Sequence, residues 1–440
     1  MAALTASALT CGDGLRTVEL AVRSAMIAVG RSLLEQLLST RDGHAGQWID
    51  CGSGHRAQFV GYRDKSLHTV LGVVRVRRAY YHCRNCNHGV VPRDQELGVV
   101  GQTLSPGLRR MVARVAAVEP FASAADLLAD LAGVRLNTKR VERRAEADGL
   151  SIAAAIDNQY KAILDRSVSI PPPADAADML YIAIDGTGVP VVPAAAQDRQ
   201  GKGEDGRART REVKLACLFT QTKVDDDGRP VRDPDTSTYL ASFAPADQFA
   251  PLVHAEARRR GCEHIRQLVV LGDGATWIWN LATKIFPEAT QIVDIYHARE
   301  HLHDITKLLA GVLGDDQHTW LAERLANLDD GAIETLVKAT TQLPIGDTTV
   351  QQIDTALDYF KKNAQRMRYA YYRGQGMFIG SGTVEAGCKT LIGQRLKLSG
   401  MRWNLPGATG VITLRTQRAS NRWDQIWPDS NNQIPVPAAA

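Results

Sequence analysis

The sequence predicts an α/β protein whose sheet is built from three successive strands and then from strands that alternate with helices. The evidence is the hydrophobic pattern after residue 173, where short apolar runs come first and amphipathic segments then separate two further apolar runs. The predicted strands are 180–184, 213–220, 238–243, 267–271 and 290–295, and the helices between them are 248–260 and 276–286. This order matches an RNase H-like sheet better than a doubly wound one.

The composition is that of a folded protein with several domains. Its 440 residues are 44% hydrophobic and 23% charged, which excludes a mainly disordered chain. No apolar run approaches the roughly 18 residues that a membrane span needs, and the N-terminus shows no secretory signal. The seven cysteines are mostly scattered, which argues against a disulfide framework and favours a reducing compartment. We therefore expect a cytoplasmic protein without a membrane partner.

Helical patterns occupy residues 1–45 and return in residues 101–165. The first region is amphipathic and is expected to pack or self-associate. In the second, Ser105-Pro106 is expected to start one helix, Ser123 is placed to cap a second short helix, and Asn137 or Thr138 can cap a third. The third helix carries Lys139, Arg140, Arg143 and Arg144. A tight turn followed by a basic helix is typical of helix-turn-helix DNA binding, and the alternative is three-helix packing with no DNA role.

Residues 46–100 show short β-like runs and a Cys-x₂-Cys pair, Cys83 and Cys86. Such a pair supplies two thiolates from a tight turn, which is half of a zinc site. The candidates for the other ligands are Cys51 with either His55 or His44, of which His55 is nearer in sequence. The region is therefore predicted to be a zinc-ribbon-like module with a structural Zn²⁺, and the alternative is a degenerate module without metal.

Asp185 and Asp273 each end a predicted apolar strand and are followed by glycine. A charged group at such a point costs free energy unless it is solvated, paired or bound to metal. A single strand-end aspartate is usually a turn former, but two in matching settings, with Glu385, favour a metal site. Three carboxylates suit Mg²⁺ or Mn²⁺, and two such ions can support in-line phosphoryl transfer.

Residues 361–422 contain twelve cations and a single acid, Glu385, which gives a net charge of +11. Such a tract is typical of a surface that binds a polyanion, and the alternative is an ordinary solvated basic face. The DNA-binding candidates within it are Lys389, Arg395, Lys397 and Arg402. The 112 residues between Asp273 and Glu385 are mostly helical in pattern, so an all-helical insertion is expected at about 304–375 within a domain spanning 174–427. Residues 428–440 are expected to be a disordered tail.

Four short motifs occur in a specific order. They are Ile184-Asp185-Gly186-Thr187, Leu271-Gly272-Asp273-Gly274-Ala275, Asp294-Ile295-Tyr296-His297 and Gly380-Ser381-Gly382-Thr383-Val384-Glu385. With Met401-Arg402-Trp403 and the zinc-ribbon-like front end, the chain from about residue 48 to 403 resembles the DDE-type transposases of bacterial insertion sequences. It is most similar to the ISKra-type group, which is related to Mutator-like transposases.

The resemblance implies that Asp185, Asp273 and Glu385 form a catalytic triad with about two Mg²⁺ or Mn²⁺ ions. It implies cleavage and strand transfer of double-stranded DNA, at element ends and in the target, by a homo-oligomer. Asp294 and His297 match an Asp-x-x-His element that contacts the scissile phosphate, and the alternative for Asp294 is a helix cap. Trp48 stands where the family has a first cysteine. A non-catalytic DNA-binding protein derived from a transposase, or another RNase H-like nuclease, remains the alternative function.

Overall fold

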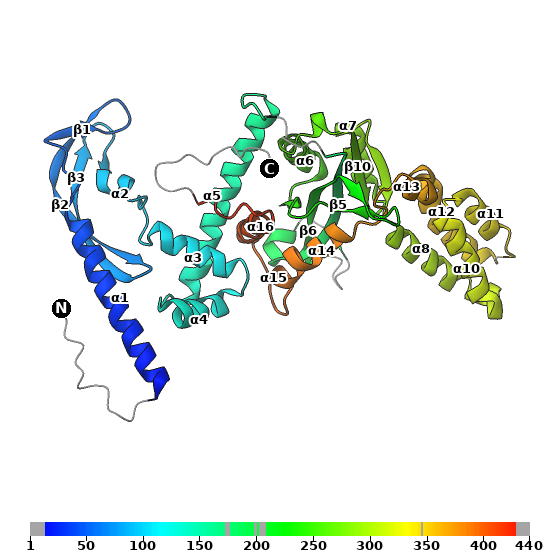
Figure 1. Cartoon of the computed structure of the whole chain (residues 1–440), viewed down its shortest axis with the longest axis horizontal. Helices are drawn as coiled ribbons and strands as arrows, with labels where there is room; N and C mark the ends of the chain where they lie inside the picture. The colour runs from blue at the N-terminus through cyan, green and yellow to red at the C-terminus, as the bar shows by residue number, and fades with distance from the viewer. Residues whose placement is uncertain (1–13, 172–176, 198–199, 202–207, 345, 428–440) are drawn as a thin grey trace. The chain divides into compact units, whose positions relative to one another are not determined.

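The computed structural model describes residues 14–171, 177–197, 200–201, 208–344 and 346–427. The tail predicted to be disordered, residues 428–440, lies outside the described residues. Within the described part, residues 14–148 with Trp427 form one compact unit and residues 149–426 form another (Figure 1).

The first unit begins with a long helix and a small antiparallel sheet. These elements are α1 (Leu15–Ser39), β1 (Trp48–Asp50), β2 (Arg56–Thr69), β3 (Gly72–Cys83) and β4 (His88–Val90), followed by the short helix α2 (Pro92–Glu96). The strands pair in the order β1-β2-β3-β4, and α1 packs on β3. The long β2–β3 ribbon buries Val74 and Val76 in one cluster and Ala79, Tyr81 and Cys83 in another. Since side chains alternate along a strand, the two ends of the ribbon bury opposite faces.

Three helices complete the first unit: α3 (Pro106–Ala116), α4 (Phe121–Ala132) and α5 (Thr138–Leu164). The helix start predicted at Ser105-Pro106 is confirmed, and the Ser105 hydroxyl caps the helix by accepting a hydrogen bond from the amide of Leu108. The predicted cap at Ser123 is wrong, because α4 already begins after Pro120 and Ser123 lies inside its first turn. The Asn137 side chain accepts from the amide of Arg140 at the start of α5. That helix has 27 residues, and the division between the two units falls inside it.

The second unit is built on a mixed five-stranded sheet. Its strands are β5 (Met179–Pro190), β6 (Thr210–Gln221), β9 (Thr238–Ser242), β10 (Gln267–Gly272) and β11 (Thr290–Val293), in the spatial order β11-β10-β5-β6-β9. β5, β6 and β9 form an antiparallel meander, and β10 and β11 add to the other side of β5 as parallel strands. All five predicted strands are present, and their order is consistent with an RNase H-like fold. A separate pair, β7 (Lys223–Val224) and β8 (Pro230–Val231), forms a small hairpin.

Helices cover both faces of this sheet. They are α6 (Ala246–Arg259), α7 (Thr276–Ile285), α14 (Gly382–Gly387), α15 (Gln394–Leu396) and α16 (Leu405–Ala419). On β6, the Lys214 ammonium lies 5.2 Å from the Trp277 ring of α7, whereas Leu215 contacts Gly387 of α14. Because neighbouring residues on a strand point to opposite faces, α7 and α14 lie on opposite sides of the sheet.

The region predicted as an all-helical insertion is helical. Its helices are α8 (Ile295–Leu308), α9 (Ala310–Leu313), α10 (Gln317–Asp329), α11 (Ile333–Thr341), α12 (Asp347–Asn363) and α13 (Tyr369–Gly374). Within the described part of residues 304–375 no strand occurs. Across the described residues, none of the helices combines the length and the apolar character needed to cross a bilayer.

Candidate metal and catalytic sites

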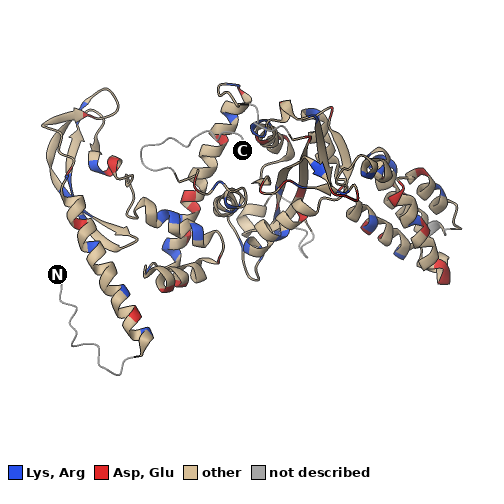
Figure 2. Cartoon of the chain, viewed as in Figure 1, with Lys and Arg blue, Asp and Glu red and all other residues tan. Residues whose placement is uncertain are grey.

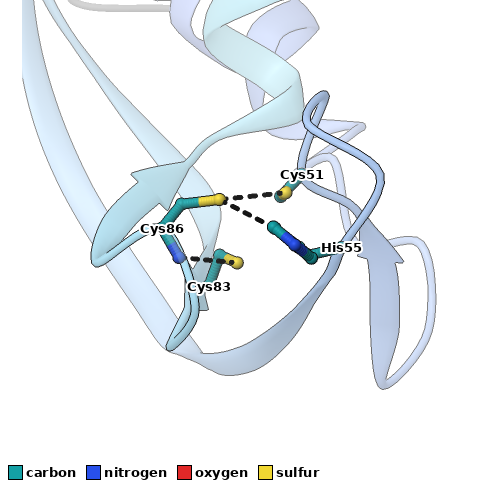
Figure 3. A group of neighbouring side chains, drawn as sticks. All are labelled: Cys51, His55, Cys83 and Cys86. Carbon is teal, nitrogen blue, oxygen red and sulfur yellow. Dashed lines mark hydrogen bonds between the residues drawn. The ribbon is translucent and has the colours of Figure 1, made fainter.

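The predicted zinc ligands come together at the end of the β2–β3 ribbon (Figure 3). Cys51 and His55 begin and end the loop between β1 and β2, and Cys83 and Cys86 frame the turn before β4, so two separate segments supply the ligands. The ligand atoms of all four residues lie within 4.8 Å of one another. His44, the other candidate, instead packs against the rings of Phe59, Tyr62 and Tyr81.

The geometry of this cluster fits a tetrahedral zinc ion. The Cys51 and Cys86 sulfurs are 3.7 Å apart, close to the roughly 3.8 Å that tetrahedral Zn–S bonds of about 2.3 Å impose. Nδ1 of His55 lies 3.1 Å from the Cys86 sulfur. Burial and hydrogen bonding to Cys83 raise the pKa of Cys86 to about 11, because a thiolate at this position meets other sulfurs without a compensating cation. Three cysteines and one histidine could therefore hold a structural Zn²⁺.

We expect the purified protein to contain about one zinc ion per chain, and Cys86→Ser to lose it. The variant should also unfold at a lower temperature, since metal binding and folding of such a module are coupled. Metal analysis and thermal unfolding measure the two effects. Cys262→Ser, on a half-buried cysteine outside the cluster, is the matched control and should retain the zinc. Zinc retained in Cys86→Ser would contradict the assignment.

Asp185 and Asp273 lie on neighbouring strands of the second unit. β10 is parallel to β5, and the register pairs Leu271 with Ala183. Asp273 directly follows β10, and its charge acts on the Asp185 carboxyl, so the two side chains are close. Asp185 is also paired with Leu215 of β6, so its side chain points to the face that α14 covers. The structure therefore brings the two predicted aspartates together beneath the helix that carries Glu385.

Asp185 is a partly buried carboxylate with a second carboxylate nearby. Burial raises its pKa, and the negative charge of Asp273 raises it further. Hydrogen bonds from the Cys388 thiol and the Gly186 amide, together with the nearby His297, act in the opposite direction. A divalent cation between the two aspartates would relieve their repulsion, so this pair has the donor chemistry that Mg²⁺ or Mn²⁺ requires.

Glu385 lies in α14, a short helix that contacts β5 and β6. Its carboxylate is 41% exposed and forms an ion pair with Lys389, one turn further on. Among the described residues, the ligand atoms of Asp185, Asp273 and Glu385 do not form a group as compact as the cysteine and histidine cluster. Burial raises the pKa of Cys388, and the negative charges of Asp185 and Glu385 raise it further. Glu385 therefore acts electrostatically on the same thiol as Asp185.

Cys388 lies beside Asp185, although it was not among the predicted site residues. It follows Glu385 by three positions, a spacing that puts both side chains on one helix face, and this was the signal that could have found it. It opens a π-helical turn, Cys388–Gly393. Such turns are rare and occur frequently at functional sites.

Asp294 is fully buried and acts as a structural connector. One carboxylate oxygen accepts from the amide of Tyr296 at the start of α8, as the cap alternative predicts. The other accepts from the amide of Ser381, at 2.8 Å, and from the Ser381 hydroxyl. Since Ser381 directly precedes α14, Asp294 ties the end of β11 to the helix that carries Glu385. His297, one turn into α8, is half-buried and 3.5 Å from Glu300.

Arg395 corrects one DNA-binding prediction, because its side chain is 0% exposed. It packs 5.2 Å from the centre of the Trp403 ring and contacts the sulfur of Met401, so it belongs to the core. Lys389, Lys397 and Arg402 are exposed, as predicted for residues that contact a phosphate backbone. Lys397 donates to the hydroxyl of Thr187, two residues beyond Asp185, which places a cation beside the candidate catalytic site.

The +11 tract does not form one basic surface. Many of its cations are paired with acids from outside the tract, and Figure 2 shows acidic and basic segments interspersed over the helical insertion. The pairs include Lys361 and Lys362 with Asp358, Arg368 with Glu334 and Arg422 with Glu256. Arg415 is buried and donates to the carbonyl of Leu391 in the π-helical turn. The exposed cations near Glu385 therefore remain the candidates of this tract for binding a polyanion.

The cations of the predicted recognition helix divide into two kinds. Arg144 forms an ion pair with the buried Asp148, and Arg140 donates to the imidazole of His68 and the hydroxyl of Thr103, so both stabilise the first unit. Lys139 and Arg143 are exposed at the N-terminal end of α5. Only these two have the accessibility that a DNA contact requires.

Comparison with known proteins found no matching protein-family model and no similar curated protein. Among solved structures, one described as "Drosophila P element transposase strand transfer complex" aligns with 71% of this chain and 79% of that chain. The sequence identity is 13% and the TM-score is 0.23. We therefore base the function on the residues of this chain alone.

Proposed function

We propose that this protein is a DNA transposase that cuts and joins DNA by metal-dependent phosphoryl transfer. The observation that carries the proposal is that Asp273, directly after β10, acts through its charge on Asp185 of the parallel neighbour β5, whose side chain points to the face of the sheet that α14 covers. Two carboxylates forced together in a half-buried site are costly unless a cation joins them. The same residues carry the resemblance to DDE-type transposases of the ISKra-type group.

In this proposal, Asp185 and Asp273 hold the divalent ions, and Glu385 completes the ligand set from α14. When bound, such ions activate the attacking oxygen and stabilise the leaving oxygen of an in-line displacement. Asp294 orients the start of α14 through Ser381, and His297 of α8 is near enough for its charge to act on Asp185. The exposed cations Lys389, Lys397 and Arg402 would hold the DNA backbone beside the carboxylates.

The first unit would recognise the element ends. Lys139 and Arg143 at the start of α5 are its accessible candidates for DNA contact, and the zinc module would support the fold around them. Binding of two ends requires more than one protomer, so we expect a homo-oligomer on DNA. We further propose that the protein acts in the cytoplasm.

Cleavage of a labelled duplex that carries the terminal inverted repeat flanking the gene tests the proposal. We expect nicking at the terminus with Mg²⁺ or Mn²⁺, and a loss of at least about 100-fold in Asp185→Asn, Asp273→Asn and Glu385→Gln, since each removes a charge that holds the metal. DNA binding, measured by mobility shift, should survive in all three variants.

Two exposed carboxylates serve as matched controls. Asp178→Asn removes an aspartate at the start of β5, away from the proposed site, and Glu323→Gln alters a glutamate of α10; neither should reduce cleavage. Binding without cleavage under either metal would favour a non-catalytic DNA-binding protein derived from a transposase. Metal-dependent cleavage without preference for the terminus would favour a different RNase H-like nuclease.

A further inference from the structure

The turn that presents Asp273 is fixed by hydrogen bonds to its side chain and to its backbone. One carboxylate oxygen of Asp273 accepts from the amide of Ala275 at 2.9 Å. The backbone carbonyl of Asp273 accepts from the hydroxyl of Tyr359 at 2.9 Å. Tyr359 belongs to α12, in the helical insertion, 86 residues further along the chain. The insertion therefore reaches back to the strand end that carries a proposed metal ligand.

Tyr359 is also held by packing on both sides. Gly274 has a φ of +101°, and a Cβ added there would lie 2.5 Å from the Tyr359 ring, so the ring closes over the bare backbone. The imidazole of His301, from α8, stacks on the same ring with 3.8 Å between centroids. A ring enclosed in this way has little freedom to turn its hydroxyl away from Asp273.

We propose that Tyr359 is a positioning residue that holds the Asp273 carboxylate beside Asp185 and so sets the affinity of the site for a divalent cation. The inference rests on the proposed function and extends it, because it gives the helical insertion a part in forming the metal site. Tyr359 does not touch the reacting atoms. It acts on the carboxylate through the backbone of the turn.

The test compares Tyr359→Phe with Tyr372→Phe in the full chain. Each substitution removes one phenol hydroxyl that donates to a backbone carbonyl of the second unit, and the Tyr372 bond, to Gln365, lies away from Asp273. In a Mn²⁺ titration of DNA cleavage, Tyr359→Phe should need about 3- to 10-fold more Mn²⁺ for half-saturation, the effect of one net hydrogen bond. The rate at saturating Mn²⁺ should stay within about twofold of the wild type, since the ligands are intact. Tyr372→Phe should shift neither quantity.

A second readout needs neither metal nor DNA. Amide hydrogen exchange across residues 272–276 should become faster in Tyr359→Phe and remain unchanged in Tyr372→Phe. A wild type that cleaves, with the same Mn²⁺ requirement in both variants, would overturn the inference and leave the proposed function standing. A wild type without metal-dependent cleavage would overturn the proposed function, and with it the role in metal binding. The exchange data would still show whether Tyr359 holds the turn.

Discussion

Replacing Glu256 with glutamine is expected to lower the free energy of unfolding by about 3–5 kcal/mol, because it leaves buried cations without their counter-charge. Glu256 is 1% exposed and accepts from the guanidinium of Arg422 at 2.7 and 3.1 Å. It also accepts from the hydroxyl of Tyr160 at 2.8 Å, and Arg259 lies 3.8 Å away. These contacts join α5, α6 and the segment after α16. Denaturant unfolding measures the loss.

Glu263→Gln is the matched control, because the Glu263 side chain is 52% exposed in its pair with Arg258. It should cost less than about 1 kcal/mol, as exposed ion pairs do. An equal loss in the free energy of unfolding in the two variants would contradict the conclusion that the buried Glu256 cluster stabilises the fold more than an exposed ion pair does.

The same cluster makes the free energy of unfolding depend on pH. Burial alone would raise the pKa of Glu256, but the charges of Arg422 and Arg259 outweigh it and lower the pKa from 4.5 to about 2. Since the native pKa is below the unfolded one, the stabilisation is complete above about pH 4.5 and is lost as the pH falls toward 2. The stability difference between wild type and Glu256→Gln should therefore shrink between about pH 5 and pH 2. A constant difference over this range would show that the charge of Glu256 does not produce the stabilisation.

Asp294→Ala is expected to reduce both stability and cleavage, whereas Asp273→Asn should reduce cleavage alone. The alanine variant removes a helix cap and leaves the buried amide of Ser381 without its acceptor, at a cost of about 3–5 kcal/mol in total. It also frees the start of α14, so Glu385 loses its position. Asp273 is half-buried and its carboxylate accepts only from the nearby Ala275 amide in the described hydrogen bonds, so its amide analogue should fold normally.

Thermal unfolding and the terminus-cleavage assay, run on the same preparations, separate these two effects. Asp304→Ala, on an aspartate of α8 that is 68% exposed, is the control for Asp294 and should change neither quantity. An Asp294→Ala protein of wild-type stability with no cleavage would instead assign Asp294 a direct chemical role.

The sheet was predictable because its strands are apolar runs of the right length with clear breaks between them. The proximity of Asp185 and Asp273 was predictable from strand ends, because the carboxyl ends of parallel neighbours meet at one edge of the sheet. The zinc ligands were predictable for a similar local reason, since Cys83 and Cys86 frame one turn. His55 joins them because it ends the loop that begins at Cys51.

The misplaced residues were those whose partners lie far along the chain. Arg395 counted as a surface cation in the sequence, but its environment is set by core residues around Trp403. Arg422 is paired with Glu256, which lies 166 residues earlier in the chain. Counting the charges of neighbouring residues in the sequence therefore does not reveal the pair. Tyr359 carried no signal in its own neighbourhood. The only hint was the glycine after Asp273, which leaves room for a close approach.

The connection between Asp294 and Ser381 sets an order for assembly during synthesis. A chain made from its N-terminus completes all five strands of the sheet by residue 293, but Ser381 and Glu385 emerge almost 90 residues later. The long-range contacts that hold α14 over Asp185 can therefore form only after the strands of the sheet and the helical insertion have been synthesised. A nascent or prematurely terminated chain would have the sheet and both aspartates but no third carboxylate. Under the proposed function, such a chain lacks one of the three metal ligands until its synthesis has passed α14.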